Sequence, residues 1–396
     1  MDFEVSPREK ALRRVARRFL EENCGPAYVR SMETTESGFS AEFLTQLADL
    51  GWTSLLVPEA LGGLGKGASD LSILMQEVGR FLAPGPILET VVYGALAVVE
   101  MPDENARTAA IDGIMSGKVQ VANAMLGPSE LEIAEVRTSA TLAGNSYVVD
   151  GTKEFVRWAL GATHALVLAH DASSPLLLLV DLASAGVVTT PLVSAGSDGQ
   201  ANVTFDGVRV ARDHVVAEGP AAQDLVEELR RYGRLALTAM MVGGSTRLFE
   251  MGHQHAQTRR QFGRPIGSFQ VIQHQLVDVC AEVDGSQILL DQAAWLLEEG
   301  LECDQELLGL VGVAGQVYVD TSHTIGHIHG GYGLMKIHDV QLYYRRAKAF
   351  QSIDLSASGA FLELAAIGHL RWQADALGAS LSGRYLYPQA SSAVTG

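Results

Sequence analysis

The chain has 396 residues, of which 47% are hydrophobic, and a chain of that size can bury two or three domain cores. Its formal net charge of −17 argues against nucleic acid and against an anionic membrane surface as partners. The three cysteines are widely separated and lack a CxxC spacing, which indicates reduced thiols rather than a metal site. Because the first residues are acidic and no apolar run reaches about 18 residues, we expect a cytoplasmic protein without a membrane span.

The residues up to 117 are predicted to form an N-terminal helical domain. Ser6 and Glu9 flank Pro7 in the pattern of a capping box, which predicts the start of a helix. Further helices are expected over residues 40–50, 70–81 and 87–99. The glycine-rich stretch 57–67 lacks the spacing of a phosphate-binding loop, so we interpret it as a turn with a structural role.

Residues 118–218 are predicted to form a middle β domain, because the hydrophobic period changes there. Short runs rich in Val, Thr and Leu are separated by Gly, Asp and Ser at spacings typical of hairpins. The expected strands cover residues 119–126, 136–142, 147–149, 165–169, 176–180, 187–190 and 202–205.

Residues 219–378 are predicted to form a C-terminal four-helix bundle, followed by a tail over 379–396. The expected helices cover residues 222–258, 269–300, 305–329 and 338–370. Long helices joined by short turns pack as an antiparallel bundle. Apolar residues occur nearly all round the helix at 307–319, which predicts burial on more than one side, as at a subunit interface.

Two glycine-containing motifs in this last third are candidates for phosphate recognition. The first, RRQFGRPIGSFQ, begins at Arg259, whose planar guanidinium suits a phosphate group. A solvated basic helix end is the alternative interpretation of this arginine. The second, HIHGGYG, contains Gly330 and Gly331, which let the backbone approach a ligand closely. Neither motif fits the strand–turn–helix fingerprint of dinucleotide-binding domains.

The motifs, together with the helix–strand–helix order, resemble the acyl-CoA dehydrogenase flavoproteins over nearly the whole chain. The resemblance implies a mostly α fold with an inserted β domain: an N-terminal helical domain, a middle barrel-like β domain and a C-terminal four-helix bundle. It also implies FAD, held at its ADP half across a dimer interface. The residues that would hold it are Arg259, Phe262, Gln270, Gly330 and Gly331, with His327 in place of the usual glutamine.

In this family a carboxylate removes the α-proton of an acyl thioester while the flavin accepts a hydride from Cβ. Gapless alignment after Ala347 places Asp354 where one class of these enzymes has its glutamate base. A polar turn residue is the alternative interpretation of Asp354. The other class carries its glutamate just before an arginine that matches Arg234, a candidate substrate-side residue, and here Gly233 fills that position. Asp354 is therefore the candidate base.

The chain departs from the family pattern where the flavin ring and substrate would be contacted. Residues 123–131 read NAMLGPSEL and lack the T-E-P-x-A-G-S-D motif. Phe155 and Arg157 replace a tryptophan and a hydroxyl residue, and we interpret the neighbouring Trp158 as core packing. A chain that keeps the ADP-side residues but loses the ring-side motif is expected to be half of a hetero-oligomer. The simplest form is α₂β₂ with a paralogous subunit, and a homo-oligomer is the alternative.

We therefore predict FAD-dependent α,β-dehydrogenation of an acyl-CoA, with an electron-transfer flavoprotein as electron acceptor. A divergent subunit of this kind suggests a ring-bearing or branched acyl group, such as a steroid side chain. Two alternatives remain open: a non-catalytic subunit that only completes the FAD site, and a flavin monooxygenase or acyl-ACP oxidase on the same fold. No metal site is predicted, because His323, His327 and His329 lack a further ligand.

Overall fold

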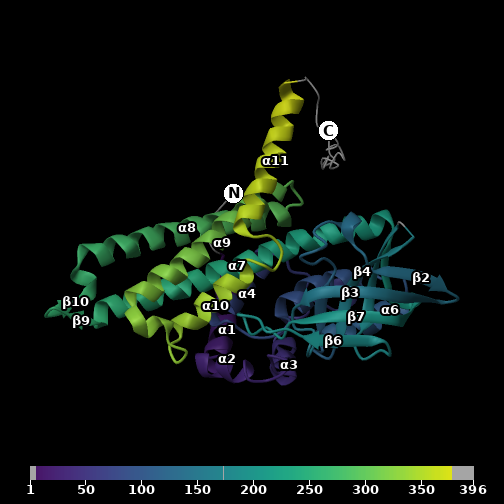
Figure 1. Ribbon diagram of the computed structural model, residues 1–396, viewed down its shortest axis with the longest axis horizontal. Helices are drawn as coiled ribbons and strands as arrows, with labels where there is room; N and C mark the ends of the chain where they lie inside the picture. Colours follow the sequence, from purple (N-terminus) through teal and green to yellow (C-terminus); the bar gives the residue numbers. More distant parts are fainter. Residues whose placement is uncertain (1–5, 173, 377–396) are drawn as a thin grey trace, which may run out of the picture.

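The computed structural model describes residues 6–172 and 174–376 (Figure 1). Six helices form the N-terminal part as far as it is described: α1 (Pro7–Asn23), α2 (Pro26–Met32), α3 (Ala41–Asp49), α4 (Ala68–Phe81), α5 (Ala95–Val99) and α6 (Glu104–Met115). The capping box at the start of α1 is confirmed, since Glu9 N–H donates to Ser6 Oγ and Ser6 N–H to Glu9 Oε2. The helices α2 and α6 were not predicted. Within the predicted helix 87–99, the segment η2 (Glu89–Gly94) is π-helical.

The β domain is one eight-stranded sheet within the described residues. Its strands are β1 (Val121–Ala124), β2 (Ser139–Ala143), β3 (Ser146–Val156), β4 (His164–Asp171), β5 (Ser174–Asp181), β6 (Val187–Pro191), β7 (Ala201–Ala211) and β8 (Val215–Glu218). The order is β6-β7-β3-β2-β4-β5-β8, with β1 paired in parallel to β4. All seven predicted strands are confirmed, and β8 was missed. Alternating residues such as Val149, Val167, Leu178 and Phe205 form its core.

The C-terminal part begins with the 39-residue helix α7 (Pro220–Thr258). A small hairpin follows, and then four further helices. These elements are β9 (Arg260–Gln261), β10 (Arg264–Pro265), α8 (Gln270–Glu298), α9 (Asp304–Ile328), η6 (Gly330–Leu334), α10 (Val340–Phe350) and α11 (Ala357–Ala376). The β domain lies near the start of α7 and the β9–β10 hairpin lies at its other end, while α11 projects from the bundle (Figure 1).

The single helix predicted over 338–370 is wrong, because the chain breaks between α10 and α11. The break holds Ser352, Asp354 and Ser356, whose side chains compete with the helical hydrogen bonds of the backbone. Ser356 Oγ accepts from the N–H of Gly359 at the start of α11, and the Gln351 side chain donates to Gly315 O on α9. The break moves Asp354 out of a helix face and into a connecting loop.

Burial around α9 is confirmed, but its cause lies within the chain. The helix packs against α7, α8, α10 and α11 of the same chain, and residues on several of its sides are buried, including Leu307, Leu308 and Leu310. An all-round apolar helix is expected at the centre of a bundle. The apolar pattern of 307–319 therefore needs no subunit interface to explain it.

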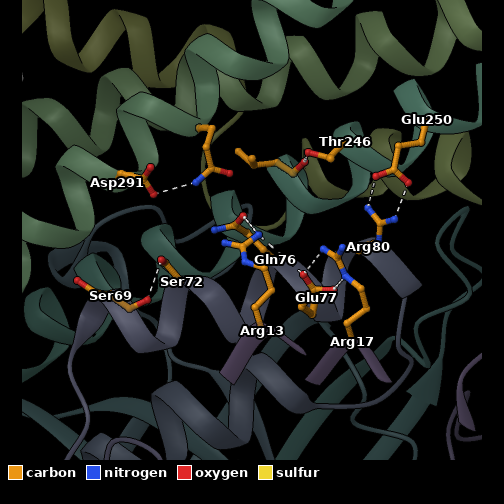
Figure 2. A network of polar contacts seen from close by, with 12 residues as sticks. Arg13, Arg17, Ser69, Ser72, Gln76, Glu77, Arg80, Thr246, Glu250 and Asp291 are labelled. Carbon is orange, nitrogen blue, oxygen red and sulfur yellow. Dashed lines mark hydrogen bonds and ion pairs between the residues drawn. The ribbon is translucent and has the colours of Figure 1, made fainter. Parts of the chain in front are cut away.

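A network of charged side chains joins the N-terminal helices to the bundle (Figure 2). Glu77 on α4 is 1% exposed, and its two carboxylate oxygens accept from Arg17 on α1 at 2.7 and 2.9 Å. One helical turn away, Arg80 donates to both oxygens of Glu250 on α7 at 2.8 and 2.5 Å. Paired and hydrogen-bonded charges can be buried between helices, so this network fixes α1 and α4 on the bundle.

Within residues 6–172 and 174–376, no helix is long and apolar enough to cross a membrane. Across the same residues, no group of three His, Cys, Asp or Glu side chains could hold a metal ion. Cys24, Cys280 and Cys303 are free thiols. The predicted tail 379–396 lies outside the described residues.

Candidate active site and cofactor-binding arm

A cavity of about 610 Å³ lies where the β domain meets α7 and the α10–α11 connection. Its walls come from η2, the loop after β1, the end of β3, the connection between β6 and β7, the first half of α7, and the end of α10 with the connection to α11 that contains Asp354. Glu363 on α11 completes the lining. Apolar side chains make up much of the wall, among them Leu88, Met125, Leu126 and Phe155. A concave, mostly apolar cavity with a few polar groups is the usual form of a small-molecule site.

Asp354 and Arg234, which the sequence singled out separately, form an ion pair at this cavity. Nε of Arg234 donates to Oδ2 of Asp354 at 2.7 Å, and the Asp354 side chain is 24% exposed. Burial alone would lower the pKa of Arg234, but the Asp354 carboxylate outweighs burial and raises it. A second carboxylate, that of Glu363, lies 3.9 Å from Arg234 Nη2. Asp354 therefore lines the cavity with its side chain held by the guanidinium of Arg234.

The position of the alternative base, Gly233, is filled by a neighbouring ring. A Cβ atom on Gly233 would lie 2.0 Å from the hydroxyl oxygen of Tyr93 on η2. Tyr93 lines the cavity, and burial raises the pKa of its phenol, helped by the negative charges of Asp354 and Glu89. Because the ring occupies the space that a side chain at 233 would need, a glutamate base cannot enter there without displacing Tyr93.

Arg157, which stands where the family has a hydroxyl residue, lines the cavity with a buried side chain. It donates from Nη1 to Oε1 of Glu89 at 3.1 Å and from Nε to Oδ2 of Asp198 at 2.8 Å. Burial would raise the pKa of Asp198, but Arg157 outweighs it and the pKa is lowered. For Glu89, burial outweighs Arg157 and raises the pKa. The arginine is thus fixed between two carboxylates.

The loop that departs from the family motif is fixed to strand β3 by a buried lysine. Lys153 Nζ donates to the carbonyl oxygen of Met125 at 2.9 Å and to Oε2 of Glu130 at 2.6 Å. Burial lowers the pKa of Lys153, and the Glu130 carboxylate opposes that shift. Trp158, at 1% exposure, packs edge-on against Phe39, so the prediction of core packing for this tryptophan is confirmed.

The six predicted ADP-side residues lie at the other end of the bundle. Arg259 caps the C-terminus of α7, and Phe262 follows at the hairpin with a positive φ of 52° and 92% exposure. Gln270 begins α8, His327 lies in the last turn of α9, and Gly330 and Gly331 begin η6. The ends of α7 and α9 are brought together by stacking of the His255 and His329 rings, whose centroids are 4.1 Å apart.

The arm formed by these six residues is too far from the cavity to serve it. Arg234 and Arg259 are 25 positions apart (259 − 234) along α7 and its cap, which corresponds to about 37 Å at the helical rise per residue. Figure 1 shows the β9–β10 hairpin and the β domain near opposite ends of the molecule. The arm and the cavity are therefore separate candidate regions for a flavin dinucleotide.

Both regions fit parts of such a cofactor. At the arm, the exposed Arg259 offers a cation, and the space where Cβ atoms would stand on Gly330 and Gly331 is open. Exposed backbone N–H groups beside an arginine suit a phosphate. In the cavity, apolar walls with a few fixed polar groups suit a flat ring or an acyl chain.

Several residues of the cavity were missed by the sequence analysis. Glu89 and Tyr93 lie within the apolar run ILETVVYG, where a single acidic residue was a usable signal. Glu130 in the cavity wall, and Lys153 behind it, carried no signal of their own, because only the pairing of β3 with the loop after β1 brings them together.

Comparisons with known proteins agree with this arrangement. The model "Acyl-CoA dehydrogenase, N-terminal domain" matches residues 6–118, and "Acyl-CoA dehydrogenase, C-terminal domain" matches residues 224–354. Acyl-CoA dehydrogenase FadE27 of Mycobacterium tuberculosis is 30% identical over 376 residues, which are 93% of this chain and 98% of that protein.

Two solved structures are similar over most of the chain. The crystal structure of the ChsE4–ChsE5 complex from Mycobacterium tuberculosis has a chain that is 29% identical with a TM-score of 0.82, covering 96% of this chain and 100% of that one. A variant of the Tcur3481–Tcur3483 steroid ACAD has a chain that is 28% identical with a TM-score of 0.83, covering 93% of this chain and 99% of that one. The sequence motifs, the domain order and these matches agree, and the chain belongs to the acyl-CoA dehydrogenase family.

Proposed function

We propose that this chain is one subunit of a hetero-oligomeric, FAD-dependent acyl-CoA dehydrogenase. Family membership supports acyl-CoA dehydrogenation in general. The observation that carries the subunit assignment is the loss of the T-E-P-x-A-G-S-D motif over residues 123–131, where the flavin ring and substrate would be contacted. The separation of about 37 Å along α7 between Arg234 and Arg259 supports an arm that serves the cofactor of a second chain. Two of the similar structures are named as pairs of proteins, which supports a paralogous partner.

The residues of the arm would hold the ADP half of the partner's FAD. Arg259 would neutralise a phosphate, and the bare backbone at Gly330 and Gly331 would let the cofactor approach. Phe262, Gln270 and His327 complete the exposed surface around it. When bound, FAD supplies the acceptor for the hydride that leaves Cβ of the acyl group.

In the cavity, Asp354 is the residue we assign to removal of the α-proton. Arg234 orients this carboxylate by binding Oδ2, which leaves Oδ1 without a protein hydrogen bond among the described residues. The apolar wall excludes water from the reacting carbon atoms.

Two further parts of the proposal concern the acyl group and the electron acceptor. One similar structure is described as a steroid ACAD, which supports a ring-bearing acyl group. An electron-transfer flavoprotein is the acceptor we assign, as the resemblance to the family implies.

The pairing of Asp354 with Arg234 also favours a second candidate function. In that case this chain is a non-catalytic subunit that only completes the partner's FAD site. The Asp354 carboxylate is then a structural partner of Arg234 and takes no part in proton removal. A flavin monooxygenase on the same fold is distinguished by anaerobic reduction, because acyl-CoA would not bleach its flavin in the absence of oxygen. An oxidase is distinguished in the second half of the reaction, because its reduced flavin is reoxidised rapidly by oxygen with release of hydrogen peroxide.

The test is expression of the chain alone and together with a paralogous subunit from its own source, followed by native mass and flavin stoichiometry. We expect a hetero-oligomer, with little flavin on the chain expressed alone. About one FAD for two chains would mean that this chain only completes the partner's site, whereas about one FAD per chain would mean that its own cavity also receives a flavin ring, as catalysis by Asp354 requires. A stable homo-oligomer with one FAD per chain and full dehydrogenase activity would overturn the proposal.

A further inference from the structure

The cavity contains a buried carboxylate oxygen that no described group of the protein satisfies. Glu89, the first residue of η2, is 2% exposed and lines the cavity. Its Oε1 accepts from Arg157 Nη1 at 3.1 Å, whereas Oε2 has no hydrogen-bond partner within the described part of the chain. Such an oxygen is costly to bury, and buried polar groups of this kind mark sites that a ligand or water completes.

The oxygen is held in place rather than free to turn away. Arg157 binds Glu89 and is itself bound by Asp198, whose second oxygen accepts from Ser194. Rotation of Glu89 toward solvent would break its contact with Arg157 and leave two buried charges mismatched. The π-helical turn that begins at Glu89 is a further sign of function, since such turns are frequent at functional sites.

Glu89 shares the cavity with Asp354 but has a different neighbourhood. Tyr93, one turn further along η2, lies within electrostatic reach of both carboxylates. The side chains that line the cavity beside Glu89 include the apolar Leu88 and Met125. A fixed acceptor in an apolar wall discriminates strongly between ligands that do and do not carry a donor, because a ligand without one leaves the oxygen unpaired.

We propose that Oε2 of Glu89 accepts a hydrogen bond from an O–H or N–H donor of the ligand in this cavity and thereby sets its specificity. The inference rests on the proposed function only for the nature of the ligand, an acyl-CoA with FAD. Two sources supply this chemistry: a hydroxyl group on the acyl chain or ring, and the imide N–H of the flavin. Each source gives a different result when Glu89 is changed.

The experiment uses Glu89→Gln in the purified complex. Glutamine keeps an oxygen for Arg157 but presents an NH₂ group in place of Oε2, which repels a donor. The probes are ω-hydroxyacyl-CoA thioesters of increasing chain length, each compared with its unsubstituted parent by titration calorimetry. At the length that reaches Glu89, we expect the natural protein to bind the hydroxylated chain about tenfold more tightly or better. Glu89→Gln should lose this preference while its affinity for the parent chain stays the same.

The second part of the experiment measures flavin content and the visible flavin spectrum without acyl-CoA. If Glu89→Gln changes the flavin content or spectrum, and the natural protein does not bind the hydroxylated chain more tightly than its parent, the donor is the flavin. If neither measurement changes, the proposal is overturned. Glu100→Gln, at the exposed end of α5 outside the cavity, is the matched control.

If Glu89→Gln does not fold, Glu89→Asp tests the same hydrogen bond. Glu89→Asp keeps a charge for Arg157 and withdraws the oxygen by one methylene group, so the same two comparisons apply to it. The proposed function can fail separately: a complex without dehydrogenase activity that still prefers the hydroxylated chain would support Glu89 and reject the dehydrogenase.

Discussion

Nε of Arg234 and Oδ2 of Asp354 lie 2.7 Å apart, although 120 residues separate them in the chain. The break between α10 and α11 makes this contact, because it turns Asp354 toward the first half of α7. The side chain of the candidate base is therefore oriented by Arg234, an arginine that the sequence linked only to substrate binding. The orientation of its side chain depends on this pair.

Asp354→Asn should abolish exchange of the substrate α-proton, because an amide cannot accept that proton, while its oxygen still accepts from Arg234. Exchange is measured as deuterium uptake by acyl-CoA under anaerobic conditions, with flavin content as a check on folding. Asp206→Asn, exposed on β7, is the control. Near-normal exchange in Asp354→Asn would place the base on another chain. A gain with Asp354→Glu would show that reach limits the natural residue.

Arg259→Ala should empty the flavin site of the complex, because it removes a charged contact to a phosphate worth about 1.5–3 kcal/mol. That loss corresponds to FAD binding about 10- to 150-fold more weakly, measured by flavin release on dilution. Arg260→Ala is the matched control, since the Arg260 side chain donates to Gly263 O of its own hairpin. Equal losses in both variants would mean that the hairpin contributes only general positive charge.

Gly233→Ala should destabilise the fold by about 1–3 kcal/mol, because its methyl group would overlap the buried Tyr93 ring. Gly285→Ala, in the interior of α8 with open space at its Cβ position, should be neutral or stabilising by up to about 1 kcal/mol. Midpoints of urea unfolding give both values. Adding Tyr93→Ala to Gly233→Ala should recover part of the loss, and additive losses would contradict the overlap.

Glu77→Ala should lower the free energy of unfolding by about 1–3 kcal/mol, because it leaves Arg17 facing a buried gap (Figure 2). The exposed pair Arg18–Glu22 on α1 supplies the comparison. Glu22→Ala should cost no more than about 0.5 kcal/mol, the usual value for an exposed pair on one helix. If the two variants lose the same stability, the network does not fix α1 on the bundle.

Stability at the arm should fall with acid through His255. Burial, followed by His329 and Arg259, lowers the pKa of His255 to about 4. Between about pH 6.5 and 4 the unfolded chain binds a proton that the folded chain does not, so stability decreases as the pH falls through that window. His255→Gln should flatten the decline of Tm there, while His253→Gln, exposed on the same helix, should not. Parallel declines in all three proteins would disprove the role of His255.

The order of the elements could be predicted from the sequence, and the residues of the arm could be proposed from it, because both rest on local patterns. Helical and strand periods set the helix–strand–helix order, and the capping box at Ser6 set the start of α1. Arg259 and Gly330 lie in short contiguous motifs that need no distant partner to be recognised. Short elements with weak patterns, namely α2, α6 and β8, were missed for the same reason.

The cavity was decided by the tertiary structure, because its decisive contacts join residues far apart in the chain. Arg157 meets Glu89 across 68 residues, and Arg234 meets Asp354 across 120. No local period encodes such pairs; they form where η2, the β sheet and the α10–α11 break converge. Likewise, the sequence motifs indicate the residues of the arm, but only the length of α7 shows that the arm lies far from the chain's own cavity.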